Sequence, residues 1–338
     1  MAIRDELITD IRDLIEESRS RVSVEVNAAL TMLNWHIGKR IDRDILKGDR
    51  AEYGREIVST LSRELQIDYG KGFSKKNIWR IIQFSRVFPD KEIVVTLSRE
   101  LSWSHFLALI PLKKPFQRQF YAEMCRLEGW SVRTLREKID SMLYERTAIS
   151  KKPQELAEKE LSNLREKDRL APDLVLKDPY VLDFLELSDH YLEKDLEDSI
   201  LRELEEYLLE LGAGFTFICR QKRIQIDNDD FYIDLLFYNR KLNRLIAMDL
   251  KLGKFKAEYK GQMELYLRWL AKNEQGDNEK TPLGIILCAG KKHEQIELLE
   301  LDSSGIHVAE YLTVLPPKKV LENRLHRAIE KARSRSED

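Results

Sequence analysis

The spacing of apolar and polar residues divides the chain into a helical first part and a second part that contains strands. As far as residue 147, apolar residues recur at intervals of three and four, which is typical of amphipathic helices. From residue 179 onward, short apolar runs bounded by turn-forming residues predict strands. The stretch between is dense in charge and interrupted by prolines. We therefore expect a helical domain at 1–147, a charged linker at 148–178 and a second domain at 179–338.

The predicted fold class is α+β and multidomain. Predicted helices cover 3–45, 52–65, 75–88, 103–110, 120–127, 132–146, 183–211, 296–301 and 320–333. Predicted strands cover 215–220, 223–226, 232–238, 245–250, 282–288 and 308–315. The early helices indicate an N-terminal all-α domain that is helix-turn-helix-like. The later elements indicate a C-terminal α/β domain, in which a mixed sheet has helices on its faces.

Two of the predicted strands form a hairpin that carries unusual charges. The runs 232–238 and 245–250 flank a polar turn and contain Asp234 and Asp249, respectively. Lys251 comes two residues after Asp249, so alternation places both side chains on one face of the second strand. Asp234 can reach that face from the neighbouring strand. The hairpin thus predicts two carboxylates and an amine at one point.

This cluster suits metal-assisted hydrolysis of a phosphodiester. An ionised carboxylate in an apolar strand needs a partner, and two carboxylates repel each other unless a cation lies between them. We expect Asp234 and Asp249 to bind Mg²⁺, with Mn²⁺ as the alternative ion and the Leu250 carbonyl as a third ligand. Lys251 would position the attacking water and offset charge in the transition state. An acid from the preceding acidic helix can complete the metal shell.

The motif resembles the PD-(D/E)XK nuclease superfamily, in the form Asp234 followed by Asp249-Leu250-Lys251. Gln262 and Tyr266 in the next predicted helix are similar to the QxxxY motif of RecB-like nucleases. A closer resemblance, to the YhcG-like family, is carried by FYIDLLFYN, the DLK segment, EYKGQMELYL, LLELGAGFTFICRQ and GIILC. The first half resembles that family's helical domain in LNWHIGKRI, GFSKKNIWRI, LSWSHF and WSVRTLREKI. The resemblance covers nearly the whole chain.

The resemblance implies a restriction-endonuclease-like sheet and a set of site residues. The implied catalytic residues are Asp234, Asp249, Lys251 and Gln262. The implied metal ligands are Asp234, Asp249, Leu250 and Glu197, with Glu203 and Glu206 as alternatives to Glu197. The implied substrate contacts are Arg220, Gln221 and Tyr266, although Tyr266 equally suits packing of the helix on the sheet. Lys254, Lys256 and Lys260 fit either a track for backbone phosphates or a solvated face.

A basic helix in the first half is the candidate for DNA binding. Lys75, Lys76 and Arg80 follow a turn that contains glycine, and no acid occurs between Lys71 and Pro89. Cations on a narrow helix suit the phosphates and major groove of DNA. A solvated charged face is the equally weighted alternative. A further basic cluster lies at 133–138.

Bulk properties indicate a cytoplasmic protein that does not span a membrane. The formal net charge is −2, so any surface for nucleic acid must be a local patch. The chain lacks a long apolar run and a signal-peptide pattern, and its three cysteines form no CxxC pair.

The family resemblance implies a bacterial Mg²⁺-dependent endonuclease that cleaves DNA, with a homodimer expected because cutting two strands needs two active sites. A DNA-binding or scaffold protein that has lost activity is the first alternative, and an RNA-processing nuclease is the second. Repair, restriction of foreign DNA and defence against mobile elements remain open as the biological role.

Overall fold

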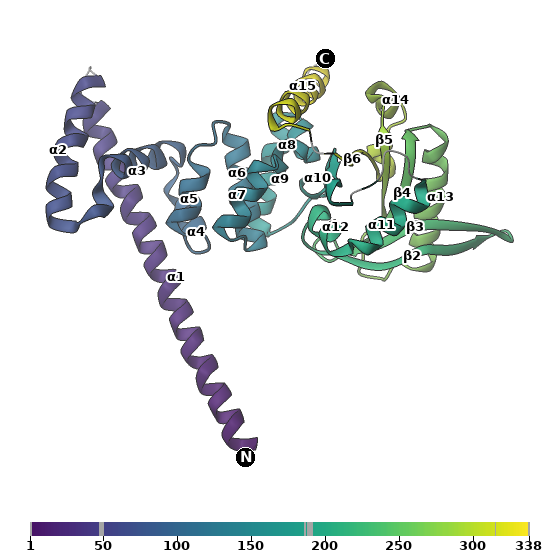
Figure 1. Cartoon of the computed structure of the whole chain (residues 1–338), viewed down its shortest axis with the longest axis horizontal. Coiled ribbons are helices and arrows are strands. Elements are labelled where there is room, and N and C mark those ends of the chain that lie inside the picture. The colour runs from purple at the N-terminus through teal and green to yellow at the C-terminus, as the bar shows by residue number, and fades with distance from the viewer. Residues whose placement is uncertain (1, 47–50, 186, 188–191, 315, 337–338) are drawn as a thin grey trace. The chain divides into compact units, whose positions relative to one another are not determined.

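The protein consists of two compact units, Met1–Ser141 and Met142–Asp338 (Figure 1). The structure is a computed structural model that describes residues 2–46, 51–185, 187, 192–314 and 316–336. The described part of the first unit is helical, and the strands belong to the second unit. An all-α region followed by a mixed sheet with flanking helices confirms the predicted fold class.

The first unit is built from helices joined by short turns. They are α1 (Ala2–Leu46), α2 (Ala51–Tyr69), the 3₁₀ helix η1 (Lys71–Phe73), α3 (Lys75–Val87), α4 (Lys91–Ser98), α5 (Trp103–Leu109), α6 (Pro115–Glu128) and α7 (Val132–Asp140). The apolar face of α3 is completely buried at Ile78, Ile81 and Ile82. Its predicted basic face remains on the outside, where Lys75 and Lys76 are exposed.

Gly38 allows α1 and α3 to pack closely. A Cβ atom at Gly38 would lie 2.3 Å from the carbonyl oxygen of Ile81 and 2.9 Å from the Cβ of Ser85. Both distances are far shorter than a van der Waals contact, so any side chain would push the helices apart. Close backbone approach therefore explains a residue that is otherwise unfavourable within a helix.

Gly38→Ala is expected to destabilise the first unit by about 1–3 kcal/mol, because overpacking outweighs the better helix propensity of Ala. Urea unfolding followed by far-UV circular dichroism measures the change. Gly72→Ala is the matched control, since a Cβ there would meet no atom within 4 Å. Equal stability of the two variants would contradict the packing role of Gly38.

The second unit surrounds its sheet with helices. The helical elements are α8 (Leu143–Arg146), η2 (Ala148–Lys151), α9 (Gln154–Lys167), α10 (Pro172–Val175), η3 (Asp183–Leu185), α11 (Glu193–Arg202), α12 (Leu204–Leu211), α13 (Glu258–Asn273), α14 (His293–Leu298), η4 (Leu301–Ser304) and α15 (Lys318–Ser336). The strands are β1 (Tyr180–Val181), β2 (Phe215–Ile226), β3 (Asp229–Asn239), β4 (Arg244–Lys254), β5 (Leu283–Gly290) and β6 (Ile306–Leu312).

The sheet has the order β1-β6-β5-β4-β3-β2 and is mixed. Neighbours from β1 to β4 are parallel, whereas β4, β3 and β2 are joined antiparallel. Ala247 of β4 belongs to a core cluster with Met263 of α13. The next residue, Met248, accepts a hydrogen bond from the Tyr207 hydroxyl of α12 at 2.6 Å. Because successive side chains point to opposite faces, α12 and α13 cover opposite faces of the sheet.

Several predicted elements differ from the observed ones. The predicted helix 132–146 is wrong as one element, since it breaks at Met142, where φ is 54°. Met142 packs in a cluster with Leu321 and Leu325 of α15, so a long-range contact fixes this break. The predicted helix 183–211 is also wrong as one element, because α11 and α12 are separate and η3 precedes them. Residues 186 and 188–191 of that prediction, and Leu315 of the last predicted strand, lie outside the described residues.

The strand predictions need two corrections. Strand β1 was not predicted, and it is only two residues long. The two predicted strands at 215–220 and 223–226 form one strand, β2, which has a register irregularity between Phe217 and Cys219. The irregularity lies within the first predicted part, and the pairs Arg220–Leu235 and Lys222–Ile233 carry the ladder with β3 across the predicted break without a shift.

The segment 148–178, which we expected to be a linker, lies inside the second unit. Leu161 and Leu164 of α9 are buried, and an ion pair of 2.6 Å joins Lys151 to Asp178 across the segment. Its high charge therefore belongs to a packed element with one solvated face. The unit boundary correspondingly falls before α8. Separately, no described helix is both long enough and apolar enough to cross a membrane.

Candidate active site

The candidate site lies where strands β3 and β4 stop pairing. The last paired residues are Leu235 and Met248. One step further, the same register would place Asp234 directly opposite Asp249. Like charges opposite each other are unfavourable in a sheet, and the ladder ends at this pair. β4 continues beside β5, where Asp249 lies opposite Ile286.

Asp234 is oriented by two donors. Its Oδ2 accepts a hydrogen bond from the Leu250 backbone N–H at 2.8 Å, and its Oδ1 accepts one from Gln221 Nε2 at 3.2 Å. The first bond replaces the backbone acceptor that a continued ladder would offer to Leu250. These two bonds hold Asp234 at the point where β3 and β4 separate.

Asp249 and Lys251 form a buried ion pair. Lys251 Nζ lies 2.9 Å from Asp249 Oδ2, yet this oxygen accepts no well-directed hydrogen bond. Burial raises the pKa of Asp249 to about 7, with repulsion by Asp234 adding to the shift and Lys251 opposing it. Burial acts to lower the pKa of Lys251, but attraction to Asp249 raises it above its ordinary value. Lys251 is therefore a cation at neutral pH, and it also lies over the ring of Tyr259, 5.2 Å from the centroid.

Helix α11 contributes two acids to the site between β3 and β4. Glu197 Oε2 accepts a hydrogen bond from Gln221 Nε2 at 2.7 Å. Burial raises the pKa of Glu197, and the bond from Gln221 opposes that shift. Glu193 was not predicted as a site residue, but its Oε1 accepts from the Leu252 backbone N–H at 3.3 Å. Glu193 could have been predicted from its position four residues before Glu197, because residues four apart share a helix face.

Gln221 lies between the acids rather than at the outer surface of the site. β2 pairs Arg220 with Leu235 and Lys222 with Ile233, so the intervening Gln221 is level with Asp234. Its backbone has a φ of 46°, in the left-handed region that residues other than glycine seldom adopt. The two hydrogen bonds of its amide, to Glu197 and Asp234, favour this unusual conformation.

Gln262 and Tyr266 pair with each other on α13. Gln262 Nε2 donates to the Tyr266 hydroxyl at 2.5 Å. Tyr266 is 1% exposed, so its ring packs in the core between α13 and the sheet. Burial raises the pKa of Tyr266, and the charge of Asp249 adds to the shift while the bond from Gln262 opposes it. The hydroxyl of Tyr266 is close enough to Asp249 and Asp234 for their charges to act on it.

The other cations predicted near the site are less closely engaged. Arg220 is exposed and forms an ion pair of 3.1 Å with Asp198. Lys254 and Lys256 are exposed. Lys260 donates to the Leu299 carbonyl oxygen at 2.8 Å, so it contributes to packing of α13.

Two acids predicted as alternative metal ligands are not brought to the aspartate pair. Glu203 and Glu206 are exposed, and in the described part of the chain neither interacts with Asp234 or Asp249. Lys75, Lys76 and Arg80 belong to α3 of the first unit.

A divalent cation fits the pair Asp234 and Asp249 better than it fits the predicted ligand set that also includes Glu197. Over the described ranges, no group of three or more His, Cys, Asp or Glu side chains is arranged to hold a metal ion. Gln221 bridges Glu197 and Asp234, so Glu197 is held through an amide. In contrast, Asp249 Oδ2 is a buried oxygen without a well-directed bond, next to a second carboxylate. Carboxylate and carbonyl oxygens are the ligands that Mg²⁺ and Mn²⁺ prefer.

One aspartate on a strand and an Asp-x-Lys on its neighbour, at the point where the two strands of a mixed sheet stop pairing, are the arrangement of a PD-(D/E)XK nuclease domain. The profile of the family described as "YhcG PDDEXK nuclease domain" matches residues 173–326, and that of the "DUF1016 N-terminal domain" matches residues 10–146. The chain is 33% identical over 348 residues to the Escherichia coli (strain K12) protein "Putative nuclease YhcG", covering 93% of this chain and 91% of that protein. The chain belongs to this family, and the predicted resemblance is confirmed.

Two solved structures resemble part of the chain. One is the crystal structure of a repair endonuclease from Pyrococcus abyssi, with a TM-score of 0.27 and 22% identity, covering 38% of this chain and 50% of that one. The other is the structure of EndoMS in apo form, with a TM-score of 0.26 and 17% identity, covering 38% of this chain and 49% of that one. The chain thus matches about half the length of each.

Proposed function

We propose that this protein is a Mg²⁺-dependent endonuclease that hydrolyses phosphodiester bonds of DNA. The observation that carries the proposal is the meeting of Asp234, Asp249 and Lys251 where β3 and β4 separate. Two carboxylates and one largely buried ammonium between two separating strands suit a phosphate group that must be both bound and polarised.

Each residue has a distinct part in this proposal. Asp234 and Asp249, with the Leu250 carbonyl, would hold the divalent ion. When bound, that ion supplies Lewis-acid polarisation of the phosphate and a lowered pKa for a water molecule. Lys251 stabilises the negative charge that develops on the phosphate, and Gln221 keeps Asp234 and Glu197 in fixed orientations. Gln262 is a candidate for contact with the substrate, since it donates a hydrogen bond to Tyr266, on whose hydroxyl the charges of Asp249 and Asp234 act.

The experiment that tests the function is a cleavage panel. Linear, nicked, branched and single-stranded DNA, together with RNA, are incubated with Mg²⁺, Mn²⁺ or EDTA. We expect products from DNA with either ion and none in EDTA, and circular DNA distinguishes internal cutting from cutting at ends. Cleavage of RNA alone would replace DNA by RNA in the proposal. Binding of DNA without any cleavage would support the inactive scaffold instead.

We also propose that α3 binds the DNA backbone. Lys75 and Lys76 are exposed at its first turn, whereas Arg86 near its end is engaged with Asp42 at 2.6 Å. Replacing Lys75 and Lys76 by Gln should weaken binding to all sequences and reduce the slope of log K against log salt by about 2. Fluorescence anisotropy over a salt series measures this. The control replaces two exposed cations at the ends of α4, Lys91 and the C-cap residue Arg99, by Gln, and an equal change there would contradict a role specific to α3.

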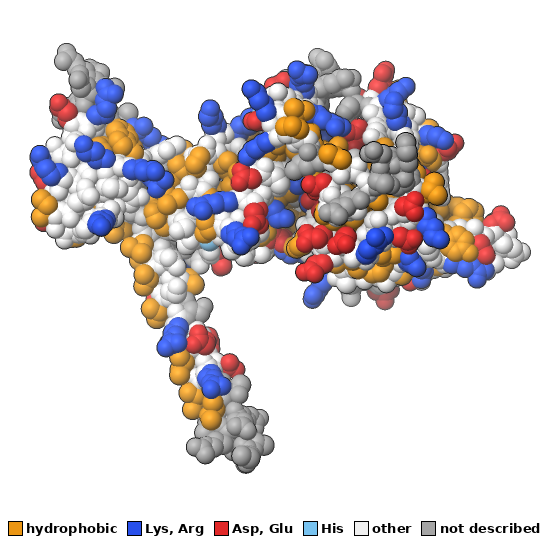
Figure 2. All heavy atoms as spheres, in the orientation of Figure 1, with side chains coloured by type: hydrophobic (Ala, Val, Ile, Leu, Met, Phe, Trp, Pro, Cys, Tyr) orange, Lys and Arg blue, Asp and Glu red, His pale blue; other side chains and the backbone are white. Residues whose placement is uncertain are grey.

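A homodimer through α1 is the second proposed partner. Apolar side chains form a stripe along this helix at Ile11, Ile15, Val22, Val26 and Leu33, each 46–57% exposed (Figure 2). Between Val22 and Leu33 the sequence holds one charged residue, which is unusual for an exposed helix. Pairing of two such stripes is the arrangement found in coiled coils.

Replacing Val22 and Val26 by Glu should therefore convert a dimer into a monomer, because charges would be buried between the paired helices. Size-exclusion chromatography with light scattering gives the mass. Arg21→Glu is the control, as it places the same charge on α1 beside the stripe. A monomeric wild-type protein at micromolar concentration would exclude this dimer.

A further inference from the structure

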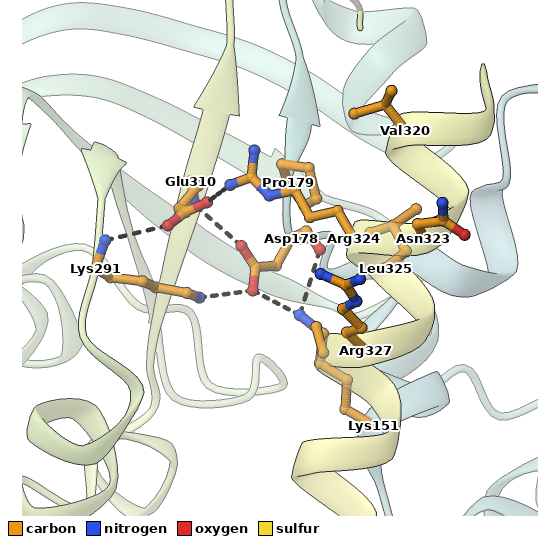
Figure 3. Close-up of a pocket in the computed structure, with 11 residues that line it drawn as sticks. Lys151, Asp178, Pro179, Lys291, Glu310, Val320, Asn323, Arg324, Leu325 and Arg327 are labelled. Carbon is orange, nitrogen blue, oxygen red and sulfur yellow. Dashed lines mark hydrogen bonds and ion pairs between the residues drawn. The ribbon is translucent and has the colours of Figure 1, made fainter. Parts of the chain in front are cut away.

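The second unit contains a cavity away from the aspartate pair, with a volume of about 520 Å³ (Figure 3). Its walls come from η2, the segment before β1, the end of β5, β6 and α15. The charged residues of its lining are Lys151, Asp178, Lys291, Glu310, Arg324 and Arg327. Four of these are cations and two are anions.

Asp178 is the fixed anion at the base of this cavity. Its Oδ2 lies 2.6 Å from Lys151 Nζ and 2.7 Å from Lys291 Nζ. Its Oδ1 accepts a hydrogen bond from the Glu310 backbone N–H at 3.0 Å. Burial alone would raise the pKa of Asp178, but Lys291 and Lys151 hold it well below its ordinary value. Asp178 therefore stays ionised and keeps the two ammonium groups together.

Glu310 neutralises a third cation. It forms an ion pair with Arg324 of α15 and accepts a hydrogen bond from the Lys291 backbone N–H at 3.2 Å. Arg324 is thus held at the rim by β6. The three cations Lys151, Lys291 and Arg324 are paired with only two carboxylates. One positive charge is therefore left in excess.

Arg327 adds a second positive charge in excess. It projects from α15 toward the end of the cavity formed by Lys151 and Asp178 (Figure 3). Asn323, one turn earlier on α15, also lines the cavity. Neither side chain has a hydrogen-bond or ion-pair partner among the residues that the structure describes. The cavity therefore combines an excess of two positive charges with an unused guanidinium and an unused amide.

The cavity lies along the row of residues that leads to the candidate active site. Glu310 of β6 is opposite Cys288 of β5, and Cys288 is opposite Lys251 of β4. With strands about 4.8 Å apart, the Cα atoms of Glu310 and Lys251 are roughly 10 Å apart. That span equals about three nucleotides of B-form DNA, which rises ~3.4 Å per nucleotide.

We propose that this cavity binds a phosphate monoester, either the terminal phosphate of a nucleic-acid strand or a free mononucleotide. A monoester dianion carries the two negative charges that the cavity lacks, and a guanidinium can contact two of its oxygens at once. A phosphodiester carries only one negative charge and would leave a cation uncompensated. Assignment to a strand end rests on the proposed nuclease function, whereas phosphate binding itself does not.

Titration calorimetry with inorganic phosphate, at constant ionic strength and in EDTA, tests the site without any need for cleavage. We expect saturable binding that Arg327→Gln weakens by about tenfold or more, the effect of losing one charge-assisted contact. Asn323→Asp should weaken it as well, because it adds a negative charge at the same wall. Arg169→Gln, which removes an exposed arginine outside the cavity, should leave binding unchanged. Absence of binding, or equal binding by the wild-type and Arg327→Gln proteins, would overturn the proposal.

Competition experiments distinguish the two sources of the phosphate. Oligonucleotides with 5′-phosphate, 3′-phosphate or hydroxyl ends are bound to Lys251→Ala protein in EDTA, with and without Arg327→Gln. Tighter binding of one phosphorylated end that disappears in Arg327→Gln assigns the cavity to strand ends. Equal binding of all ends, together with Arg327-dependent binding of adenosine 5′-monophosphate, assigns it to free mononucleotides. If Arg327→Gln changes the binding of none of these ligands, the proposed phosphate site is refuted, even if the protein is found to be a nuclease.

Discussion

Replacing Lys251 by Ala is expected to lower cleavage of DNA by about 10²–10³-fold or more while binding of DNA persists. The Lys251 side chain is 13% exposed and its Nζ lies 2.9 Å from Asp249 Oδ2. Acidic neighbours raise its pKa, so it remains charged throughout the pH range of an assay. Its loss removes the one buried cation found beside the two aspartates in the described part of the chain. Single-turnover cleavage separates this effect from slow product release.

The controls for this variant separate chemistry from folding and from contamination. Lys272→Ala, on the last turn of α13, removes an exposed lysine of the same unit and should cleave at the wild-type rate. Lys251→Arg retains the charge but not the shape of the ammonium, so partial activity is expected. Unchanged cleavage in Lys251→Ala would refute the proposed role of Lys251. Loss of DNA binding in the same variant would mean that Lys251 acts in binding.

Binding of Mg²⁺ is expected to strengthen steeply with pH and to level off above about pH 7. Burial and Asp234 raise the pKa of Asp249 from 3.8 to about 7, so below that pH a proton occupies the carboxylate that the ion needs. Metal binding must displace this proton, which costs about tenfold in apparent affinity for each pH unit below the pKa. Calorimetric titration with Mg²⁺ at several pH values measures the slope. A pH-independent affinity would contradict the proposed role of Asp249.

Without metal, the stability of the folded protein should decrease as pH rises, opposite to the trend in Mg²⁺ affinity. Because the folded-state pKa of Asp249 is raised, its protonated form contributes stability that is fully present below about pH 4. That contribution is lost as pH rises through about 7, where folding forces a buried carboxylate to ionise beside Asp234. Melting temperatures in EDTA should therefore fall across this range, and Mg²⁺ should restore them. Asp249→Asn should remove both the pH dependence and the response to Mg²⁺.

The hairpin and its acids could be predicted because they depend on local rules. Alternation along β4 places Asp249 and Lys251 on one face, and a short turn fixes the register that brings Asp234 opposite Asp249. Apolar runs of strand length around isolated charges are visible in the sequence itself. Most helices of the first unit followed in the same way from periodicity, as did the basic exposed face of α3, although α4 at Lys91–Ser98 was not predicted.

The surroundings of the acids could not be predicted, since they depend on contacts between distant residues. Gln221 reaches Glu197 and Asp234 only because β2 bends into a left-handed backbone conformation beside β3. Glu193 contacts β4 because α11 packs on that strand, and nothing in an acidic helix indicates which acid faces inward. The predicted helix 132–146 breaks at Met142 for a similar reason, because Met142 packs against α15, which is distant in the sequence.

The sequence by itself therefore determined the family, the helical and sheet-containing halves, and the three residues Asp234, Asp249 and Lys251. The family follows from the resemblance of its motifs, and the other features follow from periodicity and register, which act over a few residues. Only the tertiary structure decided that Asp249 is buried with an elevated pKa, that 148–178 is packed, and that Lys151, Asp178 and Arg327 line one cavity. Burial and charge pairing depend on which distant segments meet, and a charged stretch has the same composition whether it is solvated or enclosed.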